Sequence, residues 1–272
     1  MSTNKIEIKN LTVNYTENKH SFNALHDVSF GVRSGEFVSV IGASGCGKST
    51  LLSVLEGIRK AAGGTVEIDG KTLRGTGTER GVVFQHYSLF PWMTTRDNIA
   101  FGIKQARRGI KRGERLRIAD EFLGKVGLTG FGSKYPSQLS GGMQQRAAIA
   151  RALAMNTEIL LMDEPFSAID AKNRVILQEL LLSLWEGDGS EPRKTVVFVT
   201  HDIDEAILLS DRIVVLTAHP GTVHEIVEVP FDRPRNRSEL VKTDAYGTFR
   251  NRLLSLLYQD VAERIGGEEV VI

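Results

Sequence analysis

The stretch Gly42-Ala43-Ser44-Gly45-Cys46-Gly47-Lys48-Ser49-Thr50 decides the fold. It follows the apolar run 37–41 and leads into residues 51–55, which are typical of a helix. A strand, a glycine-rich loop and a helix headed by Lys-Ser form the P-loop pattern. Backbone N–H groups grip a phosphate chain, so the loop needs backbone angles that glycine adopts most readily, and the helix start adds the positive end of its dipole. The stretch therefore predicts a nucleotide site, with Lys48 on the β- and γ-phosphates and Ser49 on Mg²⁺.

The composition is that of an ordinary globular protein. Of 272 residues, 41% are hydrophobic and 25% are charged, and the net charge of +1 gives no bulk electrostatic reason to expect nucleic acid as a partner. The single cysteine, Cys46, excludes an internal disulfide and a cysteine-based zinc cluster. The N-terminus lacks a signal-peptide core, and no apolar run approaches the about 18 residues that span a bilayer. We expect a cytosolic chain that reaches a membrane only through a partner.

The hydrophobic pattern predicts an α/β fold. Alternation over 6–15, with an irregularity at Asn10, and over 28–32 indicates an N-terminal antiparallel β layer, which the hairpin signal at 65–70 extends. The remaining apolar runs predict a P-loop NTPase core with a mostly parallel sheet, together with a helical subdomain. Strands are expected at 37–41, 81–85, 159–163, 195–199, 213–216 and 223–229, and helices within 97–128.

Two basic stretches and the C-terminus complete the pattern. Residues 107–112 and the stretch 233–237, Arg-Pro-Arg-Asn-Arg, are interpreted as a solvated loop or helix end and a solvated linker. From residue 246 the chain predicts an amphipathic helix with Phe249, Leu253, Leu256, Leu257 and Val261 on its apolar face.

A second anion site is predicted at residues 139–146, Leu-Ser-Gly-Gly-Met-Gln-Gln-Arg. Ser140 is a plausible N-cap of the helix that follows, and the two glycines after it allow close approach by another group. A helix start with an exposed hydroxyl and bare backbone amides attracts an anion. One chain therefore carries two phosphate-type sites.

Polar side chains follow three of the predicted strands. Asp163 and Glu164 end an apolar strand, where Asp163 can hold Mg²⁺ and Glu164 can orient or deprotonate water. Gln85 and His201 end two other strands. A lone histidine is more often structural, but at a strand end in a P-loop protein His201 is a candidate for γ-phosphate contact.

These motifs together resemble the ordered motif set of ABC transporter ATPase subunits over about residues 4–230. The set comprises 42–50, Gln85, 139–146, Asp163-Glu164-Pro165, Ser167-Ala168-Ile169-Asp170 and His201. The run at 139–146 discriminates most, because other P-loop ATPases lack it. Ala43 stands where proline is common and Ile169 where leucine is usual, and neither carries chemistry. The resemblance implies an ATPase domain over 1–232, with a helical subdomain at about 86–155, and a helical tail over 233–272.

The resemblance also implies a role for each site residue. Tyr15 would stack on adenine, residues Gly42 to Thr50 would bind the nucleotide, and Asp170 would lie at a dimer seam. The catalytic residues would be Glu164, His201 and Gln85. The Mg²⁺ ligands would be Ser49, Gln85 and Asp163. The residues that contact the nucleotide held by the opposite subunit would be Ser140, Gly141, Gly142 and Gln144. ATP would close a two-fold homodimer and hydrolysis would release it.

Finer details resemble importers of nitrate, aliphatic sulfonates and taurine. They are the stretches 87–92 (Tyr-Ser-Leu-Phe-Pro-Trp), 200–206 and 233–235. This likeness implies transmembrane permease partners docked on the apolar loop 87–93, a periplasmic or extracellular solute-binding protein acting indirectly, and a peripheral location on the cytoplasmic face of the inner (plasma) membrane. The alternative is a soluble ABC-type ATPase of DNA repair or translation. The absence of a long coiled-coil insertion before Asp163 argues against it. The solute itself is not encoded in these residues.

Overall fold

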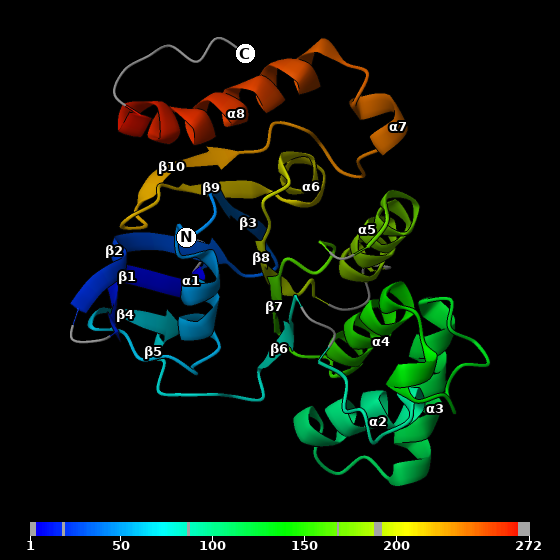
Figure 1. Ribbon diagram of the computed structural model, residues 1–272. Coiled ribbons are helices and arrows are strands. Elements are labelled where there is room, and N and C mark those ends of the chain that lie inside the picture. The colour runs from blue at the N-terminus through cyan, green and yellow to red at the C-terminus, as the bar shows by residue number, and fades with distance from the viewer. Residues whose placement is uncertain (1–3, 18–19, 86–87, 168, 188–191, 266–272) are drawn as a thin grey trace. The chain divides into compact units, whose positions relative to one another are not determined.

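A computed structural model describes residues 4–17, 20–85, 88–167, 169–187 and 192–265. The fold is mixed α/β, with parallel strands, an antiparallel sheet and helices, as the hydrophobic pattern predicts (Figure 1). The chain forms two compact units, the first from residues 1–75 and 198–272 and the second from residues 76–197.

The first unit contains a four-stranded antiparallel sheet in the order β2-β1-β4-β5. Its strands are β1 (Asn4–Glu17), β2 (His20–Arg33), β4 (Gly63–Ile68) and β5 (Lys71–Thr72). The predicted irregularity is present, because the β1–β2 register shifts between Ile8 and Leu11 and Asn10 adopts a φ of 52°. On either side of it, Ile6, Ile8, Leu11 and Val13 are all buried.

The same unit contains strands of the P-loop core. Strand β3 (Phe37–Gly42) pairs in parallel with β9 (Arg212–Leu216), which pairs antiparallel with β10 (Val223–Glu228). Strand β8 (Thr195–Val199) crosses the boundary between the units. Every residue of β3 is buried, as its continuous apolar sequence predicts. The helices of the unit are α1 (Lys48–Leu55), α6 (Ile203–Leu209), α7 (Arg237–Leu240) and α8 (Asp244–Ile265).

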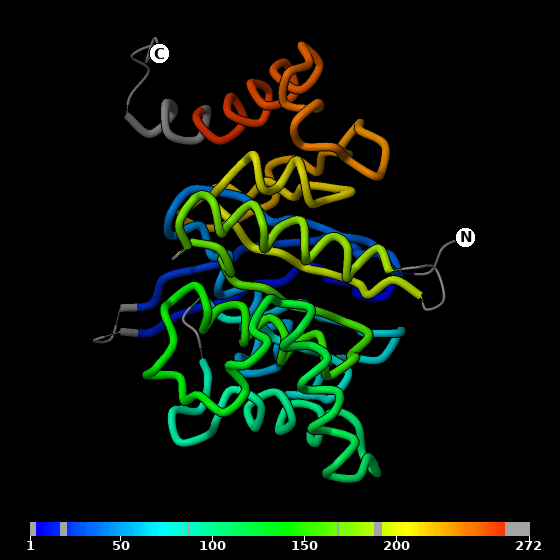
Figure 2. Tube along the Cα trace, turned by 90° about the vertical axis from the view of Figure 1, so that its right-hand side faces the viewer, coloured from blue at the N-terminus to red at the C-terminus, as the bar shows by residue number. Residues whose placement is uncertain are grey.

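Helix α8 packs along the strands and helix that precede it (Figures 1 and 2). Its buried side chains Tyr246, Phe249 and Leu253 share a hydrophobic core with residues of α6, β9 and β10, and Leu256 and Leu257 pack against that core. The predicted amphipathic helix is therefore present. The side chain of Val261 lies outside the described part of the chain.

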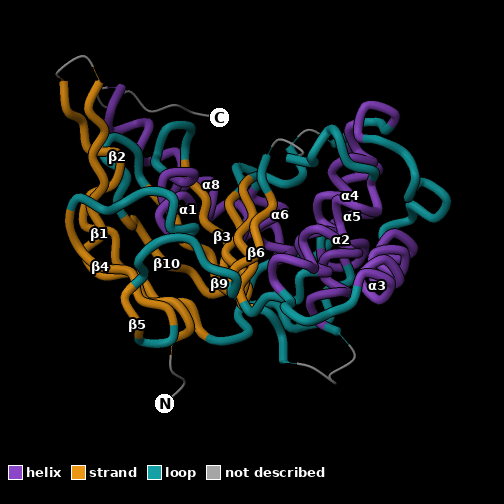
Figure 3. The backbone as a smooth tube through the Cα atoms, turned by 90° about the horizontal axis from the view of Figure 1, so that it is seen from below, coloured by secondary structure: helices purple, strands orange, loops and turns teal. Residues whose placement is uncertain are grey.

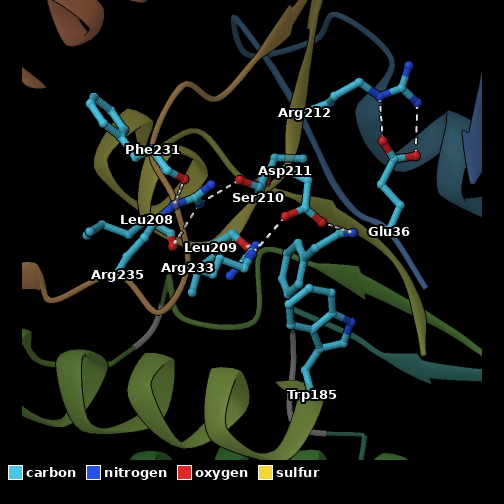
Figure 4. Close-up of polar contacts among 12 residues, drawn as sticks. Glu36, Trp185, Leu208, Leu209, Ser210, Asp211, Arg212, Phe231, Arg233 and Arg235 are labelled. Carbon is cyan, nitrogen blue, oxygen red and sulfur yellow. Dashed lines mark hydrogen bonds and ion pairs between the residues drawn. The ribbon is translucent and has the colours of Figure 1, made fainter. Parts of the chain in front are cut away.

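The prediction of a solvated linker at residues 233–237 is wrong for two of its arginines. Arg233 Nη2 donates to the carbonyl oxygen of Leu209 at 2.5 Å, and Arg235 Nη1 donates to that of Ser210 at 2.6 Å (Figure 4). These side chains are held because they supply donors to carbonyl groups at the end of α6, which have no partner within the helix.

The second unit is mainly helical (Figure 3). It contains the parallel pair β6 (Arg80–Val83) and β7 (Ile159–Asp163), together with helices α2 (Thr95–Ala106), α3 (Arg112–Lys125), α4 (Gly141–Ala154) and α5 (Ala171–Glu186). Buried side chains of α2, α3 and α4 form one core that includes Ile99, Leu123 and Ala150. The strand predicted at 81–85 ends at Val83, because its pairing with β7 ends there. Within the described residues, no helix combines the length and the apolar character needed to cross a membrane.

Candidate active site

The loop between β3 and α1 is shaped by glycines that no other residue could replace without rearrangement. Gly45 and Gly47 have φ values of 80° and 91°, in the region that favours glycine. A Cβ atom at Gly47 would lie 2.5 Å from Leu25 Cδ2 and 2.8 Å from the carbonyl oxygen of Ala24. The loop therefore lies directly on β2.

Lys48 is folded back over this loop. Its ammonium group donates to the carbonyl oxygens of Gly42 at 2.7 Å and Ala43 at 3.1 Å, and it lies 3.6 Å from the sulfur of Cys46. Burial raises the pKa of the Cys46 thiol, while the neighbouring Lys48 charge acts in the opposite direction. The thiol is neutral at physiological pH and fills the loop interior, and the Lys48 ammonium lies beside it, held by the loop carbonyl groups.

A second loop, residues 217–222, supports the P-loop and was not predicted from the sequence. Gly221 exchanges backbone hydrogen bonds with β2, donating to Ala24 at 3.1 Å and accepting from His26 at 2.9 Å. A Cβ atom at Gly45 would meet Cε1 of His219 at 3.3 Å. His219 therefore lies beside the phosphate-binding loop although 174 residues (219 minus 45) separate it from Gly45. The two residues are close because the chain turns back after β9, and no local sequence pattern predicts this turn.

Tyr15 lies at the α1 side of the same loop. Its hydroxyl is 3.1 Å from Thr50 Oγ1, so the structure connects the predicted adenine-stacking residue to the end of the P-loop. The Tyr15 ring stacks on Phe22, with ring centroids 5.5 Å apart, and the Arg59 guanidinium lies 4.0 Å from its centroid. Phe22 and Arg59 were missed by sequence reasoning. Both enlarge the aromatic and cationic surface around Tyr15.

His201 is exposed and stands between β8 and α6. The residue before it, Thr200, donates its backbone N–H to Val40 of β3 at 3.3 Å. The turn that carries His201 is therefore attached to the strand that leads into the P-loop. Within the first unit, the structure brings Tyr15, the P-loop and the His201 turn together around the ends of neighbouring elements.

In the second unit, Gln85, Asp163 and Glu164 follow adjacent parallel strands. Val83 of β6 pairs with Met162 of β7, so the carboxyl ends of the two strands coincide. Gln85 Nε2 lies 3.4 Å from Glu164 Oε2. Glu164 has a φ of 40°, a conformation uncommon for non-glycine residues and often found at functional sites. Gln85 and Glu164, both predicted from strand ends, are therefore in contact, and Asp163 precedes Glu164 at the end of β7.

The predicted second anion site is the start of α4. Ser140 is the N-cap, and its Oγ accepts a hydrogen bond from the Met143 N–H at 3.3 Å. A Cβ atom at Gly142 would meet nothing within 4 Å, so this face of the helix start is open. Gln144 donates to the carbonyl oxygen of Leu139 at 3.2 Å and braces the turn that leads into the helix. Amides at a helix start and a cap hydroxyl suit phosphate oxygens.

Asp170 is the N-cap of α5. Hydrogen bonds from the side chain and then the backbone of Asn173, at 2.7 and 3.1 Å, lower the pKa of Asp170, which stays ionised. Ala168, in the same motif, lies outside the described residues, as does Tyr87 of the apolar loop.

The candidate Mg²⁺ ligands are a hydroxyl, an amide oxygen and a carboxylate, from Ser49, Gln85 and Asp163. All are hard oxygen donors of the kind that Mg²⁺ prefers, usually with substrate phosphates and water completing the coordination. No group of three acidic, histidine or cysteine side chains suited to a metal ion occurs in the described part of the chain.

Comparison with known sequences gives extensive matches. The family model described as ABC transporter matches residues 25–167. The chain is 48% identical to the nitrate import ATP-binding protein NrtD of Synechococcus elongatus over 240 residues, covering 88% of this chain and 86% of that protein. It is 46% identical to an uncharacterized ABC transporter ATP-binding protein, MJ0412, of Methanocaldococcus jannaschii, covering 96% and 94%. The bicarbonate transport ATP-binding protein CmpC of Synechococcus elongatus is 46% identical, and the match covers 87% of this chain and 35% of that protein.

Solved structures match the fold as well. A dimeric post-hydrolysis structure of the ATP-binding cassette MJ0796 bound to ADP and Pi has a TM-score of 0.74 at 36% identity, covering 84% of this chain and all of that one. A further dimeric structure, of the same bacterial ABC transporter cassette, has a TM-score of 0.75 at 37% identity and the same coverage.

Proposed function

Because the chain belongs to the ABC transporter family and is an ATP hydrolase of that family, we propose that it is the energy-coupling subunit of an importer for a small oxyanion. The observation that carries the proposal is the near full-length identity of 46–48% to ATP-binding proteins, among them one named for nitrate import. Bicarbonate, named for a second relative, is also a small oxyanion. Sulfonates and taurine, which the stretches 87–92 and 233–235 also suggest, are likewise small solutes that carry an oxyanion group.

The chemistry that we propose is hydrolysis of ATP with Mg²⁺. Lys48 neutralises the β- and γ-phosphates, Tyr15 stacks on adenine, and Ser49 and Asp163 hold the metal ion, which balances charge on the phosphates. Glu164 orients and deprotonates the attacking water, with Gln85 beside it and His201 toward the γ-phosphate. No covalent intermediate is required, because positioning and electrostatic stabilisation account for phosphoryl transfer.

The proposed assembly is a homodimer that holds two ATP molecules. The helix start at Ser140, Gly141 and Gly142 contacts the γ-phosphate of nucleotide bound by the opposite subunit, and Asp170 lies at the seam. An open helix start and a separate P-loop in one chain support this arrangement, since two-fold symmetry lets each subunit complete the other's site. The dimeric structures of the related cassette support it further.

The proposed contact with a permease is the apolar loop before α2. Trp92 is 70% exposed, whereas Phe90 is half-buried and packs on Phe101 with ring centroids 5.0 Å apart. Arg151 fixes the loop by donating to the carbonyl oxygen and the hydroxyl of Ser88, each at 2.9 Å. An exposed large aromatic side chain is a typical anchor for a partner. This docking would place the chain on the cytoplasmic face of a membrane.

The test is capture of partners from native membranes by the tagged Glu164→Gln chain with Mg²⁺-ATP, followed by mass spectrometry. We expect a multi-span permease and, encoded or captured with it, a solute-binding protein. Binding of nitrate, bicarbonate and sulfonates by that protein then identifies the solute. Recovery of only ribosomal or DNA-associated proteins would overturn the importer proposal and leave the ATPase chemistry in place.

A further inference from the structure

Helix α6 begins immediately after the His201 turn and controls its geometry. Asp202 caps the helix, its carboxylate accepting from the backbone N–H groups of Asp204 at 2.9 Å and Glu205 at 3.2 Å. Thr200 donates from its hydroxyl to the Glu205 carboxylate at 2.6 Å. The residues on both sides of His201 are thus bonded to the first turn of α6. A displacement of α6 therefore displaces the histidine.

The far end of α6 is held by two arginines that follow β10. Arg235 Nη1 donates to the carbonyl oxygen of Ser210 at 2.6 Å, and Arg233 Nη2 donates to that of Leu209 (Figure 4). Arg235 Nη1 also donates to the carbonyl oxygen of Ile207 at 2.9 Å. Arg233 is itself fixed by an ion pair with Asp211 at 2.8 Å. Since α6 has only seven residues, these bonds satisfy most of the carbonyl groups that the helix leaves without an internal partner.

The near end of α6 is held by helix α8. Asp204 Oδ1 accepts from the Tyr246 hydroxyl at 2.7 Å and from Arg250 Nε at 2.9 Å. The Tyr246 ring is buried in the core that α8 shares with α6. Residues 231–253 therefore contact α6 at its first turn, along its apolar face and at its last carbonyl groups.

We propose that residues 231–253 form a clamp that positions His201 for hydrolysis, with Tyr246 and Arg250 as positioning residues that act through Asp204 and α6. The inference rests on the role proposed for His201. It extends that role to a part of the chain that lies outside the proposed nucleotide-binding residues. A partner that moved α8 would change the rate of hydrolysis without touching the P-loop.

The test is the full-length double variant Tyr246→Phe/Arg250→Ala, which removes both bonds to Asp204 and keeps the aromatic ring in the core. Arg252→Ala is the matched control, because Arg252 lies on the same helix but pairs with Glu225 of β10. We expect hydrogen–deuterium exchange in the peptide around residues 199–206 to become about tenfold faster, since bonds to a charged carboxylate are lost. We expect kcat to fall about tenfold with little change in the KM for ATP, because the P-loop and Tyr15, which are proposed to hold the nucleotide, are not altered.

Restoration of kcat by Tyr246→Phe/Arg250→Lys, which returns a cation to Asp204, would support positioning over a general loss of structure. Unchanged exchange at residues 199–206 in the double variant, or an equal effect of Arg252→Ala, would overturn the clamp. If the double variant does not fold, Tyr246→Phe and Arg250→Ala are measured singly; each removes one of the two bonds to Asp204, and each should shift exchange and kcat in the same direction by a smaller factor. His201→Ala is measured in parallel. Full activity of that variant would refute the role of His201, whereas the exchange data would still decide whether the clamp exists.

Discussion

Replacing Gly47 by alanine tests how closely the P-loop lies on β2. Gly47 combines two constraints, a φ of 91° and a built Cβ position 2.8 Å from the carbonyl oxygen of Ala24. Gly70, in the β4–β5 turn of the same unit, has a φ of 70° but nothing within 4 Å of its Cβ position. Gly70→Ala therefore reports the backbone strain alone, and Gly47→Ala reports strain and collision together.

The two contributions can be estimated separately. A positive φ costs an alanine about 1–2 kcal/mol, part of which is offset by the smaller entropy of its unfolded chain. Gly70→Ala should therefore lower the free energy of unfolding by about 1 kcal/mol. At Gly47 the methyl group also meets a backbone oxygen and Leu25 Cδ2, and overpacking of this kind costs about 1–3 kcal/mol more.

Urea unfolding followed by circular dichroism, without nucleotide, measures this difference directly. Both glycines lie in the first unit, so both substitutions report on the unfolding of the same structure. We expect Gly47→Ala to be less stable than Gly70→Ala by about 1–3 kcal/mol. Equal losses within about 0.5 kcal/mol would refute the reasoning, because the collision would then carry no energy.

Three further predictions concern catalysis, docking and pH. Glu164→Gln should lower phosphate release by about 10²–10⁴ and leave ATP binding intact, because only the general base is removed; normal turnover would contradict its role. Trp92→Ala should reduce permease capture and leave ATPase activity unchanged, and undiminished capture would exclude this docking contact. Burial raises the pKa of both Cys46 and Tyr246 above the ordinary values of 9.0 and 10.0, with Asp204 adding to the effect on Tyr246, so the fold favours their neutral forms. The stabilisation that comes from keeping these two groups neutral is complete below about pH 9 and is lost as the pH rises toward their raised pKa values. The urea concentration at the unfolding midpoint should therefore decrease when the pH is raised from 8 to 10.5, and it should decrease less in Tyr246→Phe.

Sequence patterns were sufficient where a function is encoded in consecutive residues. The P-loop, the helix start at Ser140 and the strand end at Asp163 each carry their own strand or helix signal, so their local structure follows from short-range rules. Gln85 and Glu164 were each predicted at a strand end, and they lie close together because the carboxyl ends of parallel strands share one edge of a sheet. These predictions needed no knowledge of how distant segments return.

Features that depend on the path of the chain were missed. His219 lies beside Gly45 only because residues 217–222 fold back on β2, and a histidine in a turn has no periodic signal. The stretch 233–237 was assigned to solvent because a run of arginines is usually solvated. An arginine bonds to carbonyl groups, and not to water, when the end of a helix lies within its reach. In this fold the end of α6 lies within reach of Arg233 and Arg235.

The choice of arginine at 233 and 235 follows from what α6 lacks. A helix of seven residues is too short to be stable by itself, and its last carbonyls diverge around the axis. A guanidinium presents several N–H groups in a fixed plane, so Arg235 can bond Ile207, Ser210 and the loop carbonyl of Phe231 at once. A lysine would offer a single ammonium group on a flexible chain and hold fewer of them. The residues that follow β10 therefore complete α6, and through α6 they complete the turn that carries His201.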